Sequence, residues 1–424
     1  MQKLDKSVFS TLFFSIFATI TGVGIVVPLL PVYARDLGGG GLYIGLIFGA
    51  FSFSRLLLLP FFGRLSDKKG RKPLIVPGLL AYTLISVAFV VFKDLHALIL
   101  IRFLQGIASA MLLPVIQAYI GDITPPGREG VVMGLFNMSV FFGLSLGPLL
   151  GGVIRDSYSL ASAFLSMGAL SFIGFLLTLI FLPPRHAESG VIRGHPPAAW
   201  TLILKDREIG GLFLFRLAYT ACIGIIWGFL PILADMELGL DSASIGFLVM
   251  LGIFISGLIH VPMGYLADRL NKKVMIFTGG LIVSYAVASY LWAGNFQQMV
   301  WASALFGIGG GICMPALMAT VVVIGDKTDA MGSVMALLTV AHSLGMLAGA
   351  MLAGVMMDVF TLRSAFPVGA AVMLVTTLVY GITGRHPETA PRKLSPPEVS
   401  GFTGDAVNFS PASGGDTRHE KNDG

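Results

Sequence analysis

The segment GRLSDKKGRK at residues 63–72 recurs as GYLADRLNKK at residues 264–273, at an offset of 201 residues. Three glycines recur at an offset of 202: Gly143, Gly147 and Gly152 correspond to Gly345, Gly349 and Gly354. Asp156 and Asp358 are separated by the same 202 residues. Offsets that agree this closely along the whole chain indicate an internal duplication, so we expect two related halves.

Composition places both halves in a membrane. Of the 424 residues, 55% are hydrophobic and 12% are charged, whereas ordinary globular proteins have about 25% charged residues. A membrane helix needs about 20 apolar residues, and twelve stretches qualify: 8–33, 42–62, 74–92, 97–121, 131–154, 160–182, 210–233, 243–266, 274–293, 297–324, 332–357 and 364–384. We therefore predict an all-α integral membrane protein with twelve transmembrane helices in two pseudo-symmetric six-helix bundles. A soluble enzyme, a nucleic-acid-binding protein and a disordered scaffold are excluded.

Hydropathy also predicts the domain boundaries. The expected units are an N-terminal bundle at 1–182, a cytoplasmic linker at 183–209, a C-terminal bundle at 210–384 and a tail at 385–424. Within the linker, Ala198–Glu208 is either a short helix in the membrane interface or a solvated connection. The tail is polar and rich in Pro, Gly and Ser, which predicts disorder.

Lys and Arg are distributed unevenly between the two sets of loops. One set contains the basic segments 63–72 and 264–273, whereas the opposite loops hold only Arg35, Lys93, Arg155 and Arg363. Cytoplasmic loops carry the Lys and Arg excess, so both termini are predicted to be cytoplasmic. The expected location is the plasma (inner) membrane, as a multi-pass protein in contact with lipid and without a nucleic-acid partner.

Individual residues of the loop at 63–72 suggest a mechanical role. Gly63 would permit close backbone approach at a helix end. Asp67 is a carboxylate that can stabilise the positive N-terminus of another helix. Gly70 and Arg71 complete the first copy, and Gly264 and Asp268 belong to the second.

This loop resembles the cytoplasmic signature of the major facilitator superfamily, and the resemblance extends over residues 8–384. In that family the acid equivalent to Asp67 faces the start of the eleventh helix, here Met331–Ser333. The arginine equivalent to Arg71 pairs with the acid that ends the fourth helix, here Asp122. The resemblance implies that these contacts lock one of two access states. The alternative is a positive loop that only sets topology.

Two further motifs resemble the same family. The segment RFLQG at 102–106 places Arg102 and Gln105 inside a span, where a charge is a functional candidate; the alternative is an arginine that snorkels to the nearby membrane surface. The fifth span fits the pattern G-x8-G-x3-GP-x2-GG with Gly134, Gly143, Gly147, Pro148, Gly151 and Gly152. That pattern is typical of drug:proton antiporters in the superfamily. Small residues allow close helix approach and a proline bends the helix, although generic packing would use the same residues.

The ionisable residues inside the spans depart from the expected antiporter. No Asp or Glu lies at the centre of a span, and the ionisable residues there are Arg55, Arg102, Arg216, His260 and His342. In one interpretation the proton carrier is Asp36, Asp235 or one of the histidines, since histidine titrates near neutral pH. In the other, the basic residues line a cavity for anions. Each of these residues also has a purely structural alternative.

The sequence therefore predicts a secondary active transporter that works by alternating access and exports small amphipathic compounds in exchange for protons. An organic-anion carrier or a flippase for lipid-like substrates is the alternative. We expect a monomer without cofactor or metal and no enzymatic activity, since neither metal-ligand spacing nor a nucleophile elbow or phosphate loop occurs. Cys222 and Cys313 fall in spans and are expected to be free apolar side chains.

Overall fold

The computed structural model describes residues 5–125, 128–183, 207–267, 269–328 and 331–384. Three sequence predictions concern residues outside these ranges: residues 198–206 of the possible interfacial helix, Asp268 of the second loop copy, and the tail at 385–424. The described residues up to 384 belong to one compact unit. Its division into bundles at 1–182 and 210–384 remains a prediction.

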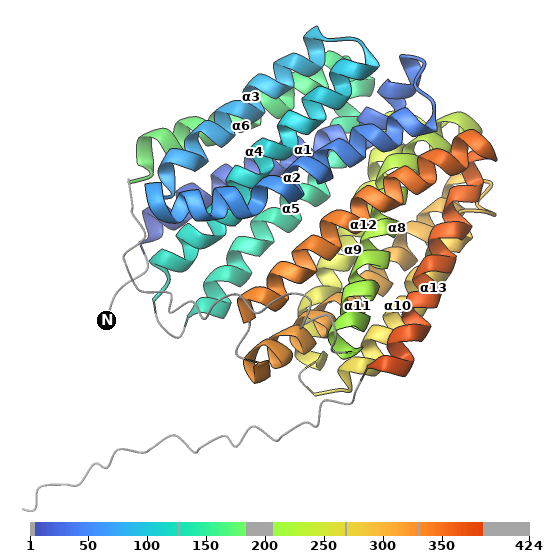
Figure 1. Ribbon diagram of the computed structural model, residues 1–424. Helices are drawn as coiled ribbons and strands as arrows, with labels where there is room; N and C mark the ends of the chain where they lie inside the picture. The colour runs from blue at the N-terminus through green and yellow to red at the C-terminus, as the bar shows by residue number, and fades with distance from the viewer. Residues whose placement is uncertain (1–4, 126–127, 184–206, 268, 329–330, 385–424) are drawn as a thin grey trace, which may run out of the picture. The chain divides into compact units, whose positions relative to one another are not determined.

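Twelve long helices follow one another along the described chain (Figure 1). They are α1 (Lys6–Asp36), α2 (Gly41–Lys69), α3 (Lys72–Val91), α4 (Leu95–Ile123), α5 (Glu129–Ser157), α6 (Leu160–Phe181), α8 (Arg207–Leu238), α9 (Ser242–Ala267), α10 (Lys272–Ser289), α11 (Phe296–Thr328), α12 (Met331–Val359) and α13 (Ala365–Thr383), with a short 3-10 turn η1 (Leu362–Ser364) before α13. Each predicted span coincides with one helix. The largest difference is in α2, which continues past residue 62 to Lys69, because charged residues can extend a helix beyond the apolar stretch that hydropathy detects.

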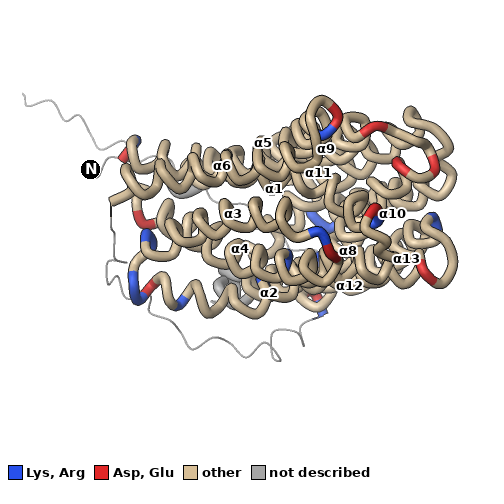
Figure 2. The backbone as a smooth tube through the Cα atoms, turned by 90° about the horizontal axis from the view of Figure 1, so that it is seen from above, with Lys and Arg blue, Asp and Glu red and all other residues tan. Residues whose placement is uncertain are grey.

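Eleven of these helices are long and apolar enough to cross a membrane. The twelfth, α10, has 18 residues and begins with Lys272 and Lys273. Charged residues gather toward the ends of the helices, and the helix bodies are largely uncharged (Figure 2). Large apolar side chains such as Leu84, Val261 and Ile382 are exposed on the outside, as expected for a surface covered by lipid. The fold is therefore that of an all-α, multi-pass membrane protein.

Short polar turns separate the helices and set their ends. Asp94 precedes α4, and its Oδ1 accepts hydrogen bonds from the backbone N–H groups of His96 and Ala97 at 2.9 and 3.2 Å, a stabilising N-terminal cap. Gly70 ends α2 with φ at +88°, a conformation that strains any residue with a side chain. The turn at Gly70 brings Arg71 back beside the last turns of α2.

Helix packing follows the duplication. In the first half α1 packs most extensively against α5 and α6, and in the second half α8 packs most extensively against α12 and α13. Contacts between the halves also occur as an equivalent pair: α5 lies against α9, and α12 lies against α2. Below, the Arg35 end is the end of the helices at which α1 finishes and α2 begins, and the Arg71 end is the opposite one.

Candidate functional site

A cavity of about 450 Å³ lies among the helices. Every helix of the described chain except α6 and α13 contributes to its lining, either directly or, for α10, through the adjoining Tyr290. A second cavity of about 310 Å³ adjoins it. Five residues line both cavities and therefore mark their boundary: Arg55, Leu113, Arg216, Met318 and His342.

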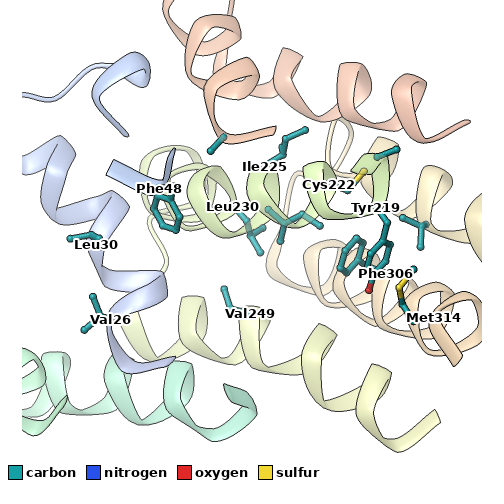
Figure 3. Close-up of a cluster of buried hydrophobic side chains, with 14 of the residues drawn as sticks. Val26, Leu30, Phe48, Tyr219, Cys222, Ile225, Leu230, Val249, Phe306 and Met314 are labelled. Carbon is teal, nitrogen blue, oxygen red and sulfur yellow. The ribbon is translucent and has the colours of Figure 1, made fainter. Parts of the chain in front are cut away.

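Most of the wall of the larger cavity is apolar and aromatic. Tyr219 of α8 and Phe306 of α11 stack with ring centroids 5.8 Å apart and planes 3° apart, and Met314 lies beside them (Figure 3). A large apolar cavity with few polar groups is the usual form of a site for small organic molecules. Methionine adds a flexible surface that can adapt to more than one ligand.

Arg216 of α8 has only weak hydrogen-bond partners among the described residues. Its Nη1 lies 2.7 Å from the thioether sulfur of Met314, and its Nη2 lies 3.3 Å from Nδ1 of His342. Its Nε is buried without a hydrogen-bond partner in the described structure. A thioether is a weak acceptor, so this guanidinium retains most of its capacity to bind an anion.

Arg55 of α2 reaches the same boundary from the other half of the chain. Its Nε is also buried, and no described residue accepts a hydrogen bond from it. Unsatisfied buried donors are costly, so a bound anion that accepted from this atom would be stabilised. Arg55 and Arg216 therefore present two guanidinium groups, one from each half.

Arg102 of α4 has a different environment. Its side chain donates from Nε to the carbonyl of Ile47 at 3.2 Å and from Nη1 to Oε1 of Gln105 at 2.7 Å. The guanidinium carbon lies 5.2 and 4.6 Å from the ring centroids of Phe48 and Phe51, within cation–π range. Only 5% of Arg102 is exposed, so it is packed between helices rather than snorkelling to the membrane surface.

The described lining of the two cavities contains no acid. Its ionisable cations and histidines are Arg55, Arg102, Arg216, His260 and His342. His260 carries its proton on Nδ1, since that atom lies 3.0 Å from the carbonyl oxygen of Ser256, which can only accept. An ensemble of guanidinium and imidazole groups without carboxylates favours a negatively charged ligand.

Asp36 and Asp235, two candidate proton carriers from the sequence, do not line either cavity. Asp235 lies 2.6 Å from Arg35 at the Arg35 end, and Asp36 lies 3.8 Å from Arg155. Both acids lie at helix ends, as the sequence predicted, and their role as proton carriers remains a prediction. They are at helix ends because an acid there remains in contact with water and a cation.

Two other acids, not selected from the sequence as site residues, connect the halves at the Arg35 end. The carboxylate of Asp358, at the end of α12, accepts from the backbone N–H groups of Gly41 and Leu42 at 2.6 and 2.8 Å. The carboxylate of Asp156, at the end of α5, accepts from those of Ser242 and Ala243 at 3.3 and 2.7 Å. Each acid thus caps the N-terminus of a helix in the other half. In the sequence, the offset of 202 residues between Asp156 and Asp358 is the feature that indicates equivalent roles.

At the Arg71 end, Arg71 joins the loop to α4. Its Nε lies 3.1 Å from Asp122, and its Nη1 lies 2.5 Å from Asp67 and 2.6 Å from Ser66, which includes the pair that the family resemblance implied. Burial lowers the pKa of Arg71, but the hydrogen bonds to Asp122 and Asp67 outweigh it, so its pKa is raised overall. The side chains of residues 331–333, the expected partners of Asp67, are outside the described set.

Two glycines of the loop motif have no close neighbour among the described residues. Gly63 lies within α2 rather than at its end, and a Cβ there would meet no atom of the described residues within 4 Å. The same holds for Gly264 in α9. Among the described residues, none shows the close backbone approach predicted at Gly63.

The glycines of α5 do have close neighbours. A Cβ on Gly143 would lie 2.9 Å from the carbonyl of Phe17, and one on Gly147 would lie 2.5 Å from that of Thr21. A Cβ on Gly151 or Gly152 would meet the backbone of α1 or α9, respectively. Gly134 differs, with open space around it. Gly143 to Gly152 therefore bring α5 against helices of both halves, on either side of Pro148.

Among the described residues no three His, Cys, Asp or Glu side chains gather closely enough to hold a metal ion. Cys222 and Cys313 are buried and unpaired, as expected from the sequence.

Duplicated helices around a ligand-sized cavity, with capping contacts between the halves, define a membrane carrier. The family model described as Major Facilitator Superfamily matches residues 12–323 and 212–412. The chain belongs to this superfamily and is a transporter rather than an enzyme.

Similar proteins support this membership. An uncharacterized MFS-type transporter of Methanocaldococcus jannaschii is 27% identical over 89% of this chain and 98% of its own length. The quinolone resistance protein NorA of Staphylococcus aureus is 28% identical over 84% of this chain and 91% of its own length. Among solved structures, the nucleoside transporter NupG has a TM-score of 0.76 at 13% identity, covering 89% of this chain and 100% of that one. The human organic anion transporter MFSD10 has a TM-score of 0.63 at 18% identity, with the same coverage.

Proposed function

We propose that this transporter carries small amphipathic organic anions. The observation that carries the proposal is the cavity in which three arginines and two histidines occur without an acid among the described lining residues. Arg55 and Arg216 provide donors for a carboxylate, sulfonate or phosphate, which guanidinium groups bind with strong charge-assisted hydrogen bonds. The aromatic wall around Tyr219 and Phe306 suits the apolar part of the same molecule.

The contacts at the two ends support alternating access around this cavity. The caps made by Asp156 and Asp358 hold the halves together at the Arg35 end, and the loop of Asp67 and Arg71 lies at the other. In the proposed cycle the two six-helix bundles rock about the cavity, as in other duplicated carriers. The excess of Lys and Arg supports a cytoplasmic position for the Arg71 end, and the proposed location is the plasma membrane.

The proposal is tested with two probes of matched shape in proteoliposomes: 1-naphthalenesulfonate, which is an anion, and neutral 1-naphthalenesulfonamide. We expect saturable transport of the sulfonate only. Arg216→Ala should reduce it roughly tenfold to a hundredfold, because a hydrogen bond to a charged group contributes about 1.5–3 kcal/mol. Arg155→Ala, at a helix end outside the cavity lining, is the matched control. Equal transport of both probes, or an unaffected Arg216→Ala variant, would refute the proposal.

A second candidate function is proton-linked export of drugs. It is supported by the 28% identity with NorA and by the glycine pattern of α5, in which all positions but Gly134 pack closely against other helices. In this case a histidine of the cavity is the proton carrier. Addition of a substrate to vesicles with an imposed pH gradient should then dissipate the gradient, whereas a flux indifferent to the gradient would exclude this candidate.

A further inference from the structure

We propose that His342 is a proton-binding site linked to anion binding at Arg216, so that the anion and a proton are carried together in the same direction. The inference rests on the proposed function, since it concerns the coupling of that same cavity. It identifies one histidine as the proton carrier and fixes the sign of the coupling.

The hydrogen bond between the two residues defines the state of the imidazole. Arg216 Nη2 lies 3.3 Å from His342 Nδ1, and a guanidinium can only donate. Nδ1 therefore carries a lone pair and no proton in this arrangement. A proton on Nδ1 would point at a positive group, so His342 is neutral while Arg216 holds it.

The other groups around His342 reinforce this neutral state. The helices that pack most extensively against α12 are α8 and α2, and they contribute Arg216 and Arg55 at the cavity boundary. In the larger cavity, α9 contributes His260 and α8 contributes the hydroxyl group of Tyr219. On α11, Cys313 is a buried free thiol. The described lining supplies no carboxylate to stabilise an imidazolium.

An anion changes this balance. Its oxygens are much better acceptors for Arg216 than a thioether and an imidazole nitrogen, so the guanidinium turns to the ligand and releases Nδ1. The negative charge also offsets the charges of Arg216 and Arg55. A proton from water then adds to the lone pair of Nδ1, forming one N–H bond with no oxidation or reduction. The added proton and a monovalent anion together bring no net charge into the cavity.

The sign of the coupling follows from linkage. If anion binding favours protonation of His342, protonation favours anion binding by the same factor. Proton and substrate therefore occupy the carrier together, which gives symport. A carboxylate-based antiporter works in the opposite way, because its proton and a cationic substrate compete for one acid.

Proton uptake on ligand binding tests the inference directly. The purified full-length protein in weakly buffered detergent solution is mixed with 1-naphthalenesulfonate, and the proton change is followed with an indicator dye between about pH 5 and 8, where histidine titrates. We expect proton uptake of up to one per protein, and an affinity that rises up to about tenfold for each unit by which pH falls. His342→Gln keeps an acceptor for Arg216, so it should bind the sulfonate with neither effect. His96→Gln changes an exposed histidine that lines neither cavity and should retain both effects.

The outcomes separate this inference from the proposed function. Preferential binding of the sulfonate without proton uptake, or proton uptake that persists in His342→Gln, would overturn the inference and leave the anion carrier intact. Proton release would also overturn it, since release indicates competition. Failure to bind the sulfonate in preference to the neutral sulfonamide would instead overturn the proposed function.

Discussion

Removal of the two carboxylates at the Arg35 end should open that end of the carrier. Asp358 and Asp156 each accept two backbone N–H groups from a helix of the other half. Loss of a side-chain cap costs about 1 kcal/mol. Both acids are exposed, so we use this value rather than the larger free-energy cost of removing a buried charge. The double variant Asp156→Ala/Asp358→Ala should therefore shift the equilibrium by about 2 kcal/mol, a factor of roughly 30.

The shift can be measured as a distance distribution between two spin labels. Tyr158, after α5, and Met236, near the end of α8, are 80% and 50% exposed at the Arg35 end, and cysteines there can be labelled after Cys222 and Cys313 are replaced by Ala. The double variant should populate longer distances. Asp94→Ala, which removes a cap within one half, should leave the distribution unchanged. The reasoning is refuted if the double variant gives the same distance distribution as the parent protein.

Three further predictions follow from contacts in the described chain. Asp67→Asn weakens the 2.5 Å contact with Arg71 and should slow transport while membrane insertion, measured by fractionation, is retained; unchanged turnover would contradict a gating role. Gly147→Leu forces a side chain against α1 and should cost about 1–3 kcal/mol of stability, measured as a lower unfolding midpoint in detergent. The control Gly134→Leu meets no described neighbour and should leave the unfolding midpoint unchanged. Asp235→Asn breaks a partly exposed ion pair and should cost about 1 kcal/mol or less with the pH dependence of transport unchanged; a changed pH profile would restore Asp235 as a coupling residue.

The helices were predictable because the membrane imposes a strong local signal. A run of about 20 apolar residues must form a helix to satisfy its backbone in lipid, so the spans coincide with the observed helices. The pair of Arg71 and Asp122 was also accessible through family resemblance. The cationic residues of the cavity were predictable as a set, since few other ionisable residues occur inside spans.

Contacts between distant helices could not be derived in the same way. The sequence does not specify how far each helix is rotated or how closely two helices approach, so Gly63 and Gly143 appeared equivalent although only Gly143 has a close neighbour. For the same reason Arg216 could be selected, but its bonds to Met314 and His342 could not. Asp358 was visible in the repeat, yet its partner on α2 depends on how the halves meet.

The reciprocal caps have an evolutionary consequence. Asp156 contacts the start of α9, and Asp358 contacts the start of α2, so each half gives the other the same bond. This reciprocity is the property of an isologous interface between identical subunits related by a two-fold axis. In a dimer of identical six-helix proteins, any mutation of the capping acid would alter both bonds at once. In a fused chain the two caps can be changed separately. One mutation then alters one cap, and its effect on the stability of the contact between the halves is half that of the same mutation in a symmetric dimer.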